Sequence, residues 1–270
     1  MIVHLIDGTY ELFRHFYGIR RFSEKDPPFG AVAGVLGTVV QMIEGGATHI
    51  AVATDRVIES FRNQLWPGYK TGAGIERALW NQFRPLEDAL MAMGVVTFPM
   101  VELEADDALA SAACAVARDE RAEKVCIWTP DKDLAQCVVG QRVVQVDRRT
   151  GKIRDEAGVR AKFGVAPQHI PDYLALVGDA ADGYPGIPRV GAKTAARLIV
   201  KHGPIEQFPS TVLGDQHELA LLFKDLATLR CNAVLFNEVD DLEWKGVTSA
   251  FAAMAEKIDP RLIARVQRVV

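Results

Sequence analysis

The sequence has no long apolar run, no closely spaced cysteine pair and no overall positive charge. A membrane-spanning helix needs about 18 or more consecutive apolar residues, and no such stretch occurs. The opening MIVHLIDGTY carries an aspartate and lacks a basic flank, unlike a signal peptide. The four cysteines form no C-x-x-C pair, which argues against a zinc site and, in a chain of 270 residues, against a disulfide framework. We therefore expect a soluble, cytoplasmic protein without a membrane partner.

The net charge of −4 argues mildly against a nucleic-acid partner when it is averaged over the chain. The distribution of charge points the other way. Residues 186–203, GIPRVGAKTAARLIVKHG, carry four lysines and arginines and no acid, and residues 147–154, DRRTGKIR, form a second short basic run. Because the local sign of the charge decides where a phosphate backbone can lie, nucleic acid stays a candidate partner.

Short apolar, β-branched runs that end in an aspartate or a turn alternate with helical patterns in the first part of the chain. The runs lie at 2–7, 49–55, 95–99, 124–131 and 142–147, and the helical patterns include 30–44, 76–93 and 105–119. This alternation predicts an α/β fold with a mostly parallel sheet and helices on both faces. Ligands of such folds bind at the carboxyl ends of the strands, where Asp7, Asp55 and Asp131 fall.

From about residue 155 the strand patterns fade, and Gly- and Pro-rich punctuation separates helices near 167–177 and 191–202. We therefore expect an α/β body over residues 1–160 and a helical lobe over residues 161–270. The last 60 residues are expected to form helices that cover the body.

Nine acidic residues stand at strand ends, turns or helix starts. They are Asp7, Asp55, Glu104, Asp106, Asp107, Asp131, Asp133, Asp179 and Asp182. Each has an ordinary alternative role as a helix cap or a solvated turn, and for the group at 104–107 alone capping is the better explanation. Together, however, they would converge at one edge of the sheet, where like charges raise each other's pKa unless a cation compensates them. All-oxygen ligands favour Mg²⁺ or Mn²⁺ over Zn²⁺, and so many carboxylates suggest two ions.

One competing interpretation starts from LIDGT, which is similar to the opening of the haloacid dehalogenase phosphatases. Their motif is D-x-D, and position 9 of this chain is threonine. That alternative is poor.

Two segments could hold a phosphate-bearing substrate. SFRNQLWPGYK at 60–70 brings Arg62, Tyr69 and Lys70 close behind Asp55, and a cation there could offset charge on a phosphate while a tyrosine stacks on a base. GIPRVGAKTAARL forms a glycine-rich turn before a basic helix, whose amides bind phosphate without reading base sequence. The alternatives are a solvated helix end and a helix hairpin with a solvated basic face.

The chain resembles the 5′–3′ exonuclease/flap endonuclease family, and it is similar to the N-terminal nuclease domain of bacterial DNA polymerase I. The matching segments are IDGTYELFR, ATDRVIESFRNQLWPGYK, VELEADDALA, TPDKDLAQ and GDAADGYPGIPRVGAKTAARLI, which follow the family's order over roughly residues 1–205. The resemblance implies a PIN-like sheet, a helical arch at about 66–85 and a helix-turn-helix DNA-binding motif at about 181–203.

The resemblance also implies roles for individual residues. Asp7, Asp55, Glu104, Asp106 and Asp107 would serve a first metal region, and Asp131, Asp133, Asp179 and Asp182 a second. Lys70, Arg62, Asp107 and Asp131 would be catalytic. Independently of the resemblance, the residues that we expect to contact DNA are Arg14, Tyr69, Arg77, Arg189, Gly191, Lys193, Thr194 and Arg197. The resemblance adds K⁺, bound by main-chain carbonyls of the helix-turn-helix motif.

Two departures from the family pattern stand near the expected site. The family commonly has D-N-[IV]-P-G where this chain has Asp182-Gly183-Tyr184-Pro185-Gly186, and the segment after Lys70 is the glycine-rich TGAGIER. The first change bears on the turn beside the metals, and the second on the order of the arch.

The leading hypothesis is therefore a two-metal 5′ nuclease that cuts DNA at single-strand/duplex junctions. Because no polymerase domain follows, we expect a separate, monomeric nuclease that works beside a polymerase and a ligase in replication or repair. The alternatives are a non-catalytic junction-binding protein and a PIN-type ribonuclease. Chains of the latter type are usually shorter and lack the GxPxVGxKTA lobe.

Overall fold

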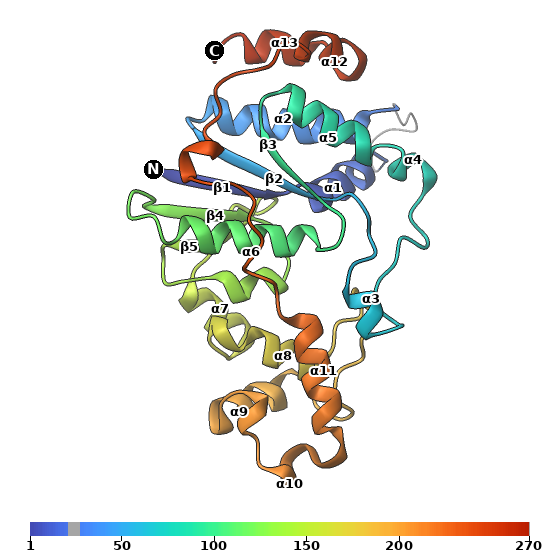
Figure 1. The fold of residues 1–270 in the computed structure, drawn as a ribbon, viewed down its shortest axis with the longest axis vertical. Coiled ribbons are helices and arrows are strands. Elements are labelled where there is room, and N and C mark those ends of the chain that lie inside the picture. Colours follow the sequence, from blue (N-terminus) through green and yellow to red (C-terminus); the bar gives the residue numbers. More distant parts are fainter. Residues whose placement is uncertain (21–27, 270) are drawn as a thin grey trace.

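A computed structural model describes residues 1–20 and 28–269 of the chain (Figure 1). Its centre is a six-stranded sheet in the order β3-β2-β1-β4-β5-β6, parallel except for the antiparallel β6 at one edge. The strands are β1 Ile2–Asp7, β2 His49–Asp55, β3 Val96–Met100, β4 Lys124–Trp128, β5 Val143–Asp147 and β6 Lys152–Arg154. The expected mostly parallel sheet is confirmed.

The sixth strand was not expected from the sequence. It lies inside the basic run 147–154, where a turn through Gly151, with φ of 68°, returns the chain antiparallel to β5. Three residues are too short to show a strand periodicity, so the pattern displayed only their charge.

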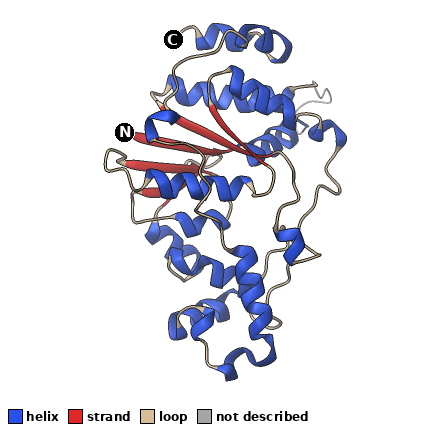
Figure 2. Cartoon of the chain, viewed as in Figure 1, coloured by secondary structure: helices blue, strands red, loops and turns tan. Residues whose placement is uncertain are grey.

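Two layers of helices cover the sheet because its strands are apolar on both faces (Figures 1 and 2). One face packs against α1, α2 and α5, with α12 and α13 stacked on α2 and α5. The opposite face packs against α6 and the chain at 229–242. The helices of this body are α1 Gly8–Arg20, α2 Gly30–Glu44, α3 Arg62–Leu65, α4 Arg77–Trp80, α5 Phe83–Ala92, α6 Ala105–Val116, α12 Phe251–Ile258 and α13 Arg261–Val266, with short 3₁₀ turns at η1 Asp133–Cys137 and η5 Val239–Leu242.

A helical lobe with its own apolar core lies beyond the β5–β6 edge, at the bottom of Figure 1. Helices α8 and α9 occupy the places expected near 167–177 and 191–202. The elements of the lobe are α7 Glu156–Phe163, η2 Pro167–His169, α8 Ile170–Val177, α9 Ala192–His202, η3 Ile205–Gln207, α10 Ser210–Leu213, η4 Gly214–Gln216 and α11 His217–Ala227.

The C-terminal part differs from the expected division. After α11 the chain does not stay in the lobe but returns over the body as a mostly extended segment, residues 228–250, which we call the strap. The indole N–H of Trp244 donates to the carbonyl of Met93 at 2.8 Å, and Trp244 N donates to Thr48 O at 2.8 Å. Helices α12 and α13 therefore belong to the body, and residues 161–270 are not one lobe.

The segment expected as a helical arch is largely irregular. Only α4 is helical between residues 66 and 82, and residues 66–76 form turns. Pro67, Gly68, Gly72 and Gly74 explain this, because proline lacks an amide donor and glycine lowers helix propensity. In addition, Gly74 adopts a left-handed φ of 87°.

Among the described residues, no helix is long and apolar enough to cross a membrane.

Candidate active site

The carboxyl ends of β1 and β2 bring a first group of acids together. Asp7 ends β1 and accepts hydrogen bonds from the Tyr10 amide at 2.8 Å and the Thr129 hydroxyl at 3.1 Å. Asp55 ends β2 and accepts from the Ala105 amide at 2.7 Å. Because β1 lies between β2 and β4, the loop after β4 brings Asp131 to the same edge.

In this first group each carboxylate raises the pKa of its neighbours. Burial, together with the charges of Asp55 and Asp131, raises the pKa of Asp7 to about 7. Burial also raises the pKa of Asp106 well above its ordinary value, followed by the charges of Asp131 and Asp7. Such a group is unstable when fully ionised, so it favours a bound cation.

A second group joins η1 to the turn after α8. Asp133, Asp179 and Asp182 are all buried, and one carboxylate oxygen of each lies within 4.8 Å of the others. The Oδ1 atom of Asp133 is buried without a hydrogen-bond partner. Burial, followed by the charges of Asp131 and Asp182, raises the pKa of Asp133 well above its ordinary value. An unsatisfied buried oxygen among acids is the feature expected of a position that holds a hard cation.

Two lysines flank these acids. The Lys70 ammonium lies 2.7 Å from Glu104 Oε2 and 3.1 Å from Asp182 Oδ1. Lys132, from the loop before η1, lies 2.7 Å from Asp179 Oδ2. Burial alone would raise the pKa of Glu104, but Lys70 and then Arg62 outweigh it and hold this pKa below its usual value. Lys70 therefore links Glu104, at the start of α6, to Asp182, in the turn after α8.

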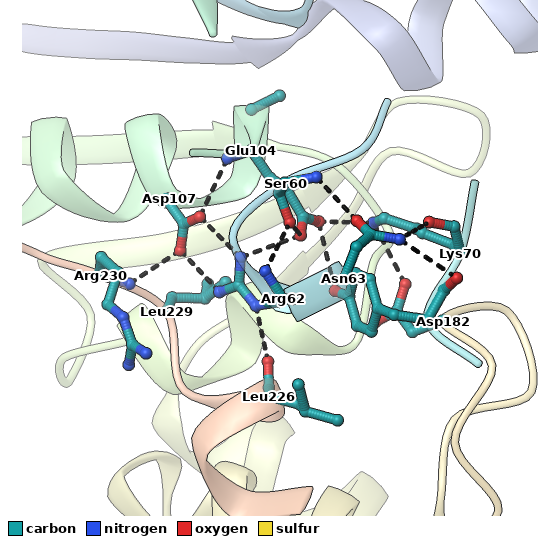
Figure 3. A network of polar contacts seen from close by, with 12 residues as sticks. Ser60, Arg62, Asn63, Lys70, Glu104, Asp107, Asp182, Leu226, Leu229 and Arg230 are labelled. Carbon is teal, nitrogen blue, oxygen red and sulfur yellow. Dashed lines mark hydrogen bonds and ion pairs between the residues drawn. The ribbon is translucent and has the colours of Figure 1, made fainter. Parts of the chain in front are cut away.

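Arg62 and Asp107 form a buried network behind the acids, shown in Figure 3. Arg62 is 1% exposed and donates to Glu104, to both oxygens of Asp107 and to the carbonyls of Leu226 and Thr228. Asp107 is fully buried and also accepts from the amides of Glu104 and Arg230. The network joins the start of α6 to the strap.

This geometry changes the interpretation of two residues expected to be catalytic. The Asp107 carboxylate accepts four hydrogen bonds, so no lone pair remains for a metal, and all donors of Arg62 point into the protein. Asp107 and Glu104 form the capping box of α6, as the ordinary alternative had it. Neither Arg62 nor Asp107 can touch a substrate without rearrangement.

Tyr69 also differs from its expected role of stacking on a base. It is 3% exposed, and its hydroxyl donates to Glu104 Oε2 at 3.3 Å. Its ring belongs to the apolar core of the lobe. A side chain buried on all sides has no face to offer a nucleobase.

The departure at Gly183 is explained by a close backbone approach. Gly183 has φ of 83°, and a Cβ atom there would lie 2.0 Å from the carbonyl oxygen of Gly68. The Lys70 amide donates to Asp182 O at 3.0 Å, and the Trp66 indole donates to Gly183 O at 3.0 Å. Glycine at both positions lets the irregular segment dock beside the acids and hold Lys70 in place.

The expected DNA-binding residues are spread over three places. Lys193 and Arg197 are exposed on α9, whose N-cap Gly191 supplies no side-chain cap. Thr194 is half-buried in the first turn of α9, and Arg189, before it, is exposed with φ of 69°. Arg77 is exposed on α4.

Arg14 stands apart from those residues, on α1. It is partly exposed and is held by Glu11 through two hydrogen bonds.

Sequence reasoning overlooked Lys132, Thr129 and Glu11. Lys132 stands inside the DKD motif, between two candidate ligands, and its contact with Asp179 is not visible in the motif. Thr129 directly precedes Pro130-Asp131 and orients Asp7. A small hydroxyl residue beside an acidic motif is a usable signal, whereas nothing in the pattern marks Glu11 as the buried partner of Arg14.

Two family models match consecutive parts of the chain. The N-terminal resolvase-like domain of 5′–3′ exonucleases matches residues 2–164, and the C-terminal SAM fold of 5′–3′ exonucleases matches residues 165–250. The chain belongs to the 5′–3′ exonuclease family.

Individual relatives agree with this membership. The chain is 33% identical over 259 residues to DNA polymerase I of Pseudomonas aeruginosa, which covers 88% of this chain but only 28% of that protein. It is 32% identical over 207 residues to a 5′–3′ exonuclease of Aquifex aeolicus, covering 76% of this chain and 71% of that one. The chain thus spans a minor part of the polymerase and most of the exonuclease.

A solved structure shares the fold. A bacteriophage T5 flap endonuclease, in a pseudo-enzyme-product complex with DNA and metal ions, aligns with a TM-score of 0.67 and 19% identity, covering 100% of this chain and 98% of that one. The expected family, its nuclease class and the fold with a helical lobe are confirmed, and neither the junction-binding alternative nor the PIN-type ribonuclease gains support.

Proposed function

We propose that this 5′–3′ exonuclease family member hydrolyses DNA phosphodiesters at single-strand/duplex junctions, by exonuclease action, flap cleavage or both. One observation carries the proposal. Two acidic groups, one at Asp7 and Asp55 and the other at Asp133, Asp179 and Asp182, meet beside Lys70 at the carboxyl edge of the sheet.

The acids fit divalent cations, and we propose Mg²⁺ or Mn²⁺, two ions in all. The donors are carboxylate oxygens only, and Asp133 Oδ1 is buried without a partner. Asp7, Asp55, Asp106 and Asp131 would hold one ion, and the second group the other. Such a pair of ions lowers the pKa of water and neutralises charge on both the attacking and the leaving oxygen.

The remaining residues position the substrate and the ligands. The Lys70 ammonium contacts Glu104 and Asp182 and has a third N–H donor. That donor is placed to bind a phosphate oxygen and to offset the charge that develops there. Lys132 holds Asp179 from the other side. Arg62 and Asp107 act indirectly, because they fix the start of α6 and with it Glu104 and Asp106.

DNA would lie against the lobe and the edge of the sheet. The exposed Lys193 and Arg197 and the open amino end of α9 suit a duplex backbone, and Arg77 is exposed on α4. We also propose, from the family resemblance, that main-chain carbonyls of the turn before α9 bind K⁺. We also propose that the protein acts in the cytoplasm as a monomer, beside a polymerase and a ligase in replication or repair.

A 5′-labelled flap duplex tests the proposal. The purified protein is incubated with it in Mg²⁺, in Mn²⁺ and in chelator, and single-stranded RNA of the same sequence is tested in parallel. We expect flap release near the junction with either metal and none with chelator. Tight flap binding without cleavage would favour a non-catalytic junction binder, and preferential cleavage of the RNA would favour a ribonuclease.

A further inference from the structure

A basic hollow lies outside the acidic site, between α1, α2 and the β5–β6 hairpin. It has a volume of about 610 Å³, and its lining includes Arg14, Arg148 and Arg149 but no acidic residue. Ligand pockets in proteins typically measure about 300–1,000 Å³. The space is therefore large enough for one nucleotide and too small for a length of duplex.

The arginines of this hollow are only partly compensated. Arg14 is paired with the buried Glu11. Arg148 donates to the neutral amide of Gln41 at 2.8 Å. Within the described part of the chain, the guanidinium of Arg149 has no ion-pair or hydrogen-bond partner. Converging positive charges that Glu11 and Asp147 offset only in part favour an anion, and arginine presents the donor geometry that a phosphate accepts.

His15 lines the same hollow, and its pKa reflects the nearby guanidinium groups. Burial, then the charges of Arg14 and Arg148, lower the pKa of His15 to about 4. The imidazole is thus neutral at physiological pH and contacts both Arg14 Nη2, at 2.8 Å, and Thr38 Oγ1, at 3.1 Å. It can orient Arg14 without adding a positive charge.

An aromatic surface completes the hollow. Trp128 ends β4, and the Arg148 guanidinium lies 5.6 Å from the centre of its ring. Its indole N–H donates to His4 Nδ1 at 3.0 Å, which fixes the plane of the ring. A neighbouring hollow of about 410 Å³ shares Met42 and Trp128 but is lined by no lysine or arginine. The cationic part of the surface therefore ends at Trp128.

The distance to the acids is short. Arg14 follows Asp7 by seven residues on the same strand–helix unit, which at about 1.5 Å per helical residue places it roughly 10 Å along α1. We propose that this hollow binds one nucleotide of single-stranded DNA beside the site of cleavage, with its phosphate on Arg148 and Arg149 and its base against Trp128. This inference rests on the proposed function, because it takes the strand from the same substrate.

The chemistry matches that of single-strand binding elsewhere. A cationic groove tracks the phosphate, while an aromatic face accepts any base because every base has a π-face. The hollow therefore adds affinity for the unpaired strand without selecting its sequence.

The test measures binding without cleavage. A labelled oligothymidylate is titrated in chelator, at several salt concentrations, into the wild type, an Arg148→Gln/Arg149→Gln double variant and an Arg118→Gln control. Arg118 is exposed just beyond α6, on the opposite face of the sheet. We expect the double variant to raise the Kd about tenfold at low salt. The slope of log Kd against log salt should fall by about 0.7, the value for one phosphate contact on a single strand.

A Trp128→Leu variant separates stacking from charge. It should raise the Kd by a similar factor but leave the salt slope unchanged, because no phosphate contact is lost. The melting temperature of each variant shows whether it has folded. Deoxythymidine monophosphate is then used as a competitor. If this mononucleotide competes at concentrations near the Kd of the oligothymidylate, the hollow is a site for free mononucleotides rather than for a strand.

The outcomes are distinguishable from those of the proposed function. If the folded double variant binds oligothymidylate with the wild-type Kd and salt slope, the inference is overturned, even when the wild type cleaves flaps. If the wild type cleaves nothing but the double variant binds weakly, the hollow stands as a single-strand site and the proposed nuclease activity fails.

Discussion

Arg62 binds Asp107 through two parallel contacts of 2.8 Å, and neither side chain is more than 1% exposed. The pair lies where α3, the start of α6 and the strap meet (Figure 3). A residue expected to face the substrate thus serves the interior of the protein.

Replacing Arg62 tests this role. In Arg62→Lys the ammonium cannot make the paired contact, so the Asp107 carboxylate is left partly uncompensated. We expect the free energy of unfolding to fall by about 1–3 kcal/mol, because buried acceptors lose their donors while the charge is kept. Urea unfolding measures the change, with Arg118→Lys as an exposed control. A free energy equal to that of the wild type would show that the pair is dispensable.

The second acidic group can be tested by one isosteric change. Asp133→Asn removes a charge while it keeps the shape of a buried side chain. We expect cleavage of a flap in Mg²⁺ to slow by about two orders of magnitude, equivalent to about 3 kcal/mol, with flap binding in chelator unchanged. Asp215→Asn, at an exposed acid of the lobe, is the matched control. An equal loss of binding and cleavage would argue that Asp133 supports the fold and not a metal.

The stability of the metal-free protein should depend on pH. The pKa of Asp7 is raised to about 7, so between its unfolded value of 3.8 and 7 the folded state binds more protons than the unfolded state. Stability with chelator should therefore decrease as the pH rises from about 5 to about 8. The lowered pKa of Glu104 acts the other way, but only below that window.

Mg²⁺ should reverse this trend, because it binds the ionised carboxylates. The increase in melting temperature that Mg²⁺ produces should be larger at about pH 8 than at about pH 5. Thermal melts at both pH values, with and without chelator, measure it. An Mg²⁺ effect independent of pH would contradict the assignment of these acids as ligands.

The approach of Gly183 to Gly68 can be separated from backbone strain. Gly183→Ala would suffer both a left-handed φ and a contact of 2.0 Å, whereas Gly214→Ala has φ of 52° and open space around its Cβ. The control should lose about 1–2 kcal/mol from its φ alone. We expect a larger loss at Gly183 and a raised KM for the flap, because the segment that carries Lys70 is displaced. Equal effects of the two changes would show that the close approach is not needed.

Charge reversal on α9 tests the lobe. Lys193→Glu with Arg197→Glu should weaken binding of a duplex flap and lower its salt dependence, because fewer phosphates are neutralised. The Mg²⁺-induced rise in melting temperature should stay as in the wild type. Lys257→Glu, on α12, serves as the control. Loss of the Mg²⁺ effect in the α9 variant would mean that the lobe and the acids are not independent.

The sheet was predictable because its strands are continuous apolar runs that end in acids, and a parallel sheet brings such ends to one edge. Asp133, Asp179 and Asp182 converge for another reason, because the turn after α8 lies beside η1, which strand ends do not predict. What the sequence could not reveal was the direction in which individual side chains point. Whether Arg62 and Tyr69 face the substrate or the interior depends on Leu226 and on Glu104, which lie far from them in the chain. Periodicity describes one element at a time and is blind to such partners.

The helical arch was predicted wrongly and the strap was not predicted, for different reasons. The glycine-rich TGAGIER already signalled weak helix propensity, but the family resemblance outweighed it. Apart from the short turn η5, the strap has no regular structure to predict, since its contacts with Ser111, Gln136 and Met93 exist only after the body has folded.

The strap also determines how the chain can be divided. Arg62 and Asp107 belong to the first family unit, residues 2–164, yet they bind main-chain atoms of Leu226, Thr228 and Arg230 in the second. Cutting the gene between the units would expose a buried guanidinium and carboxylate on one fragment and their orphaned backbone partners on the other. The two units are therefore not exchangeable cassettes: a chimera of two relatives would have to inherit the strap and α12–α13 together with the body they cover.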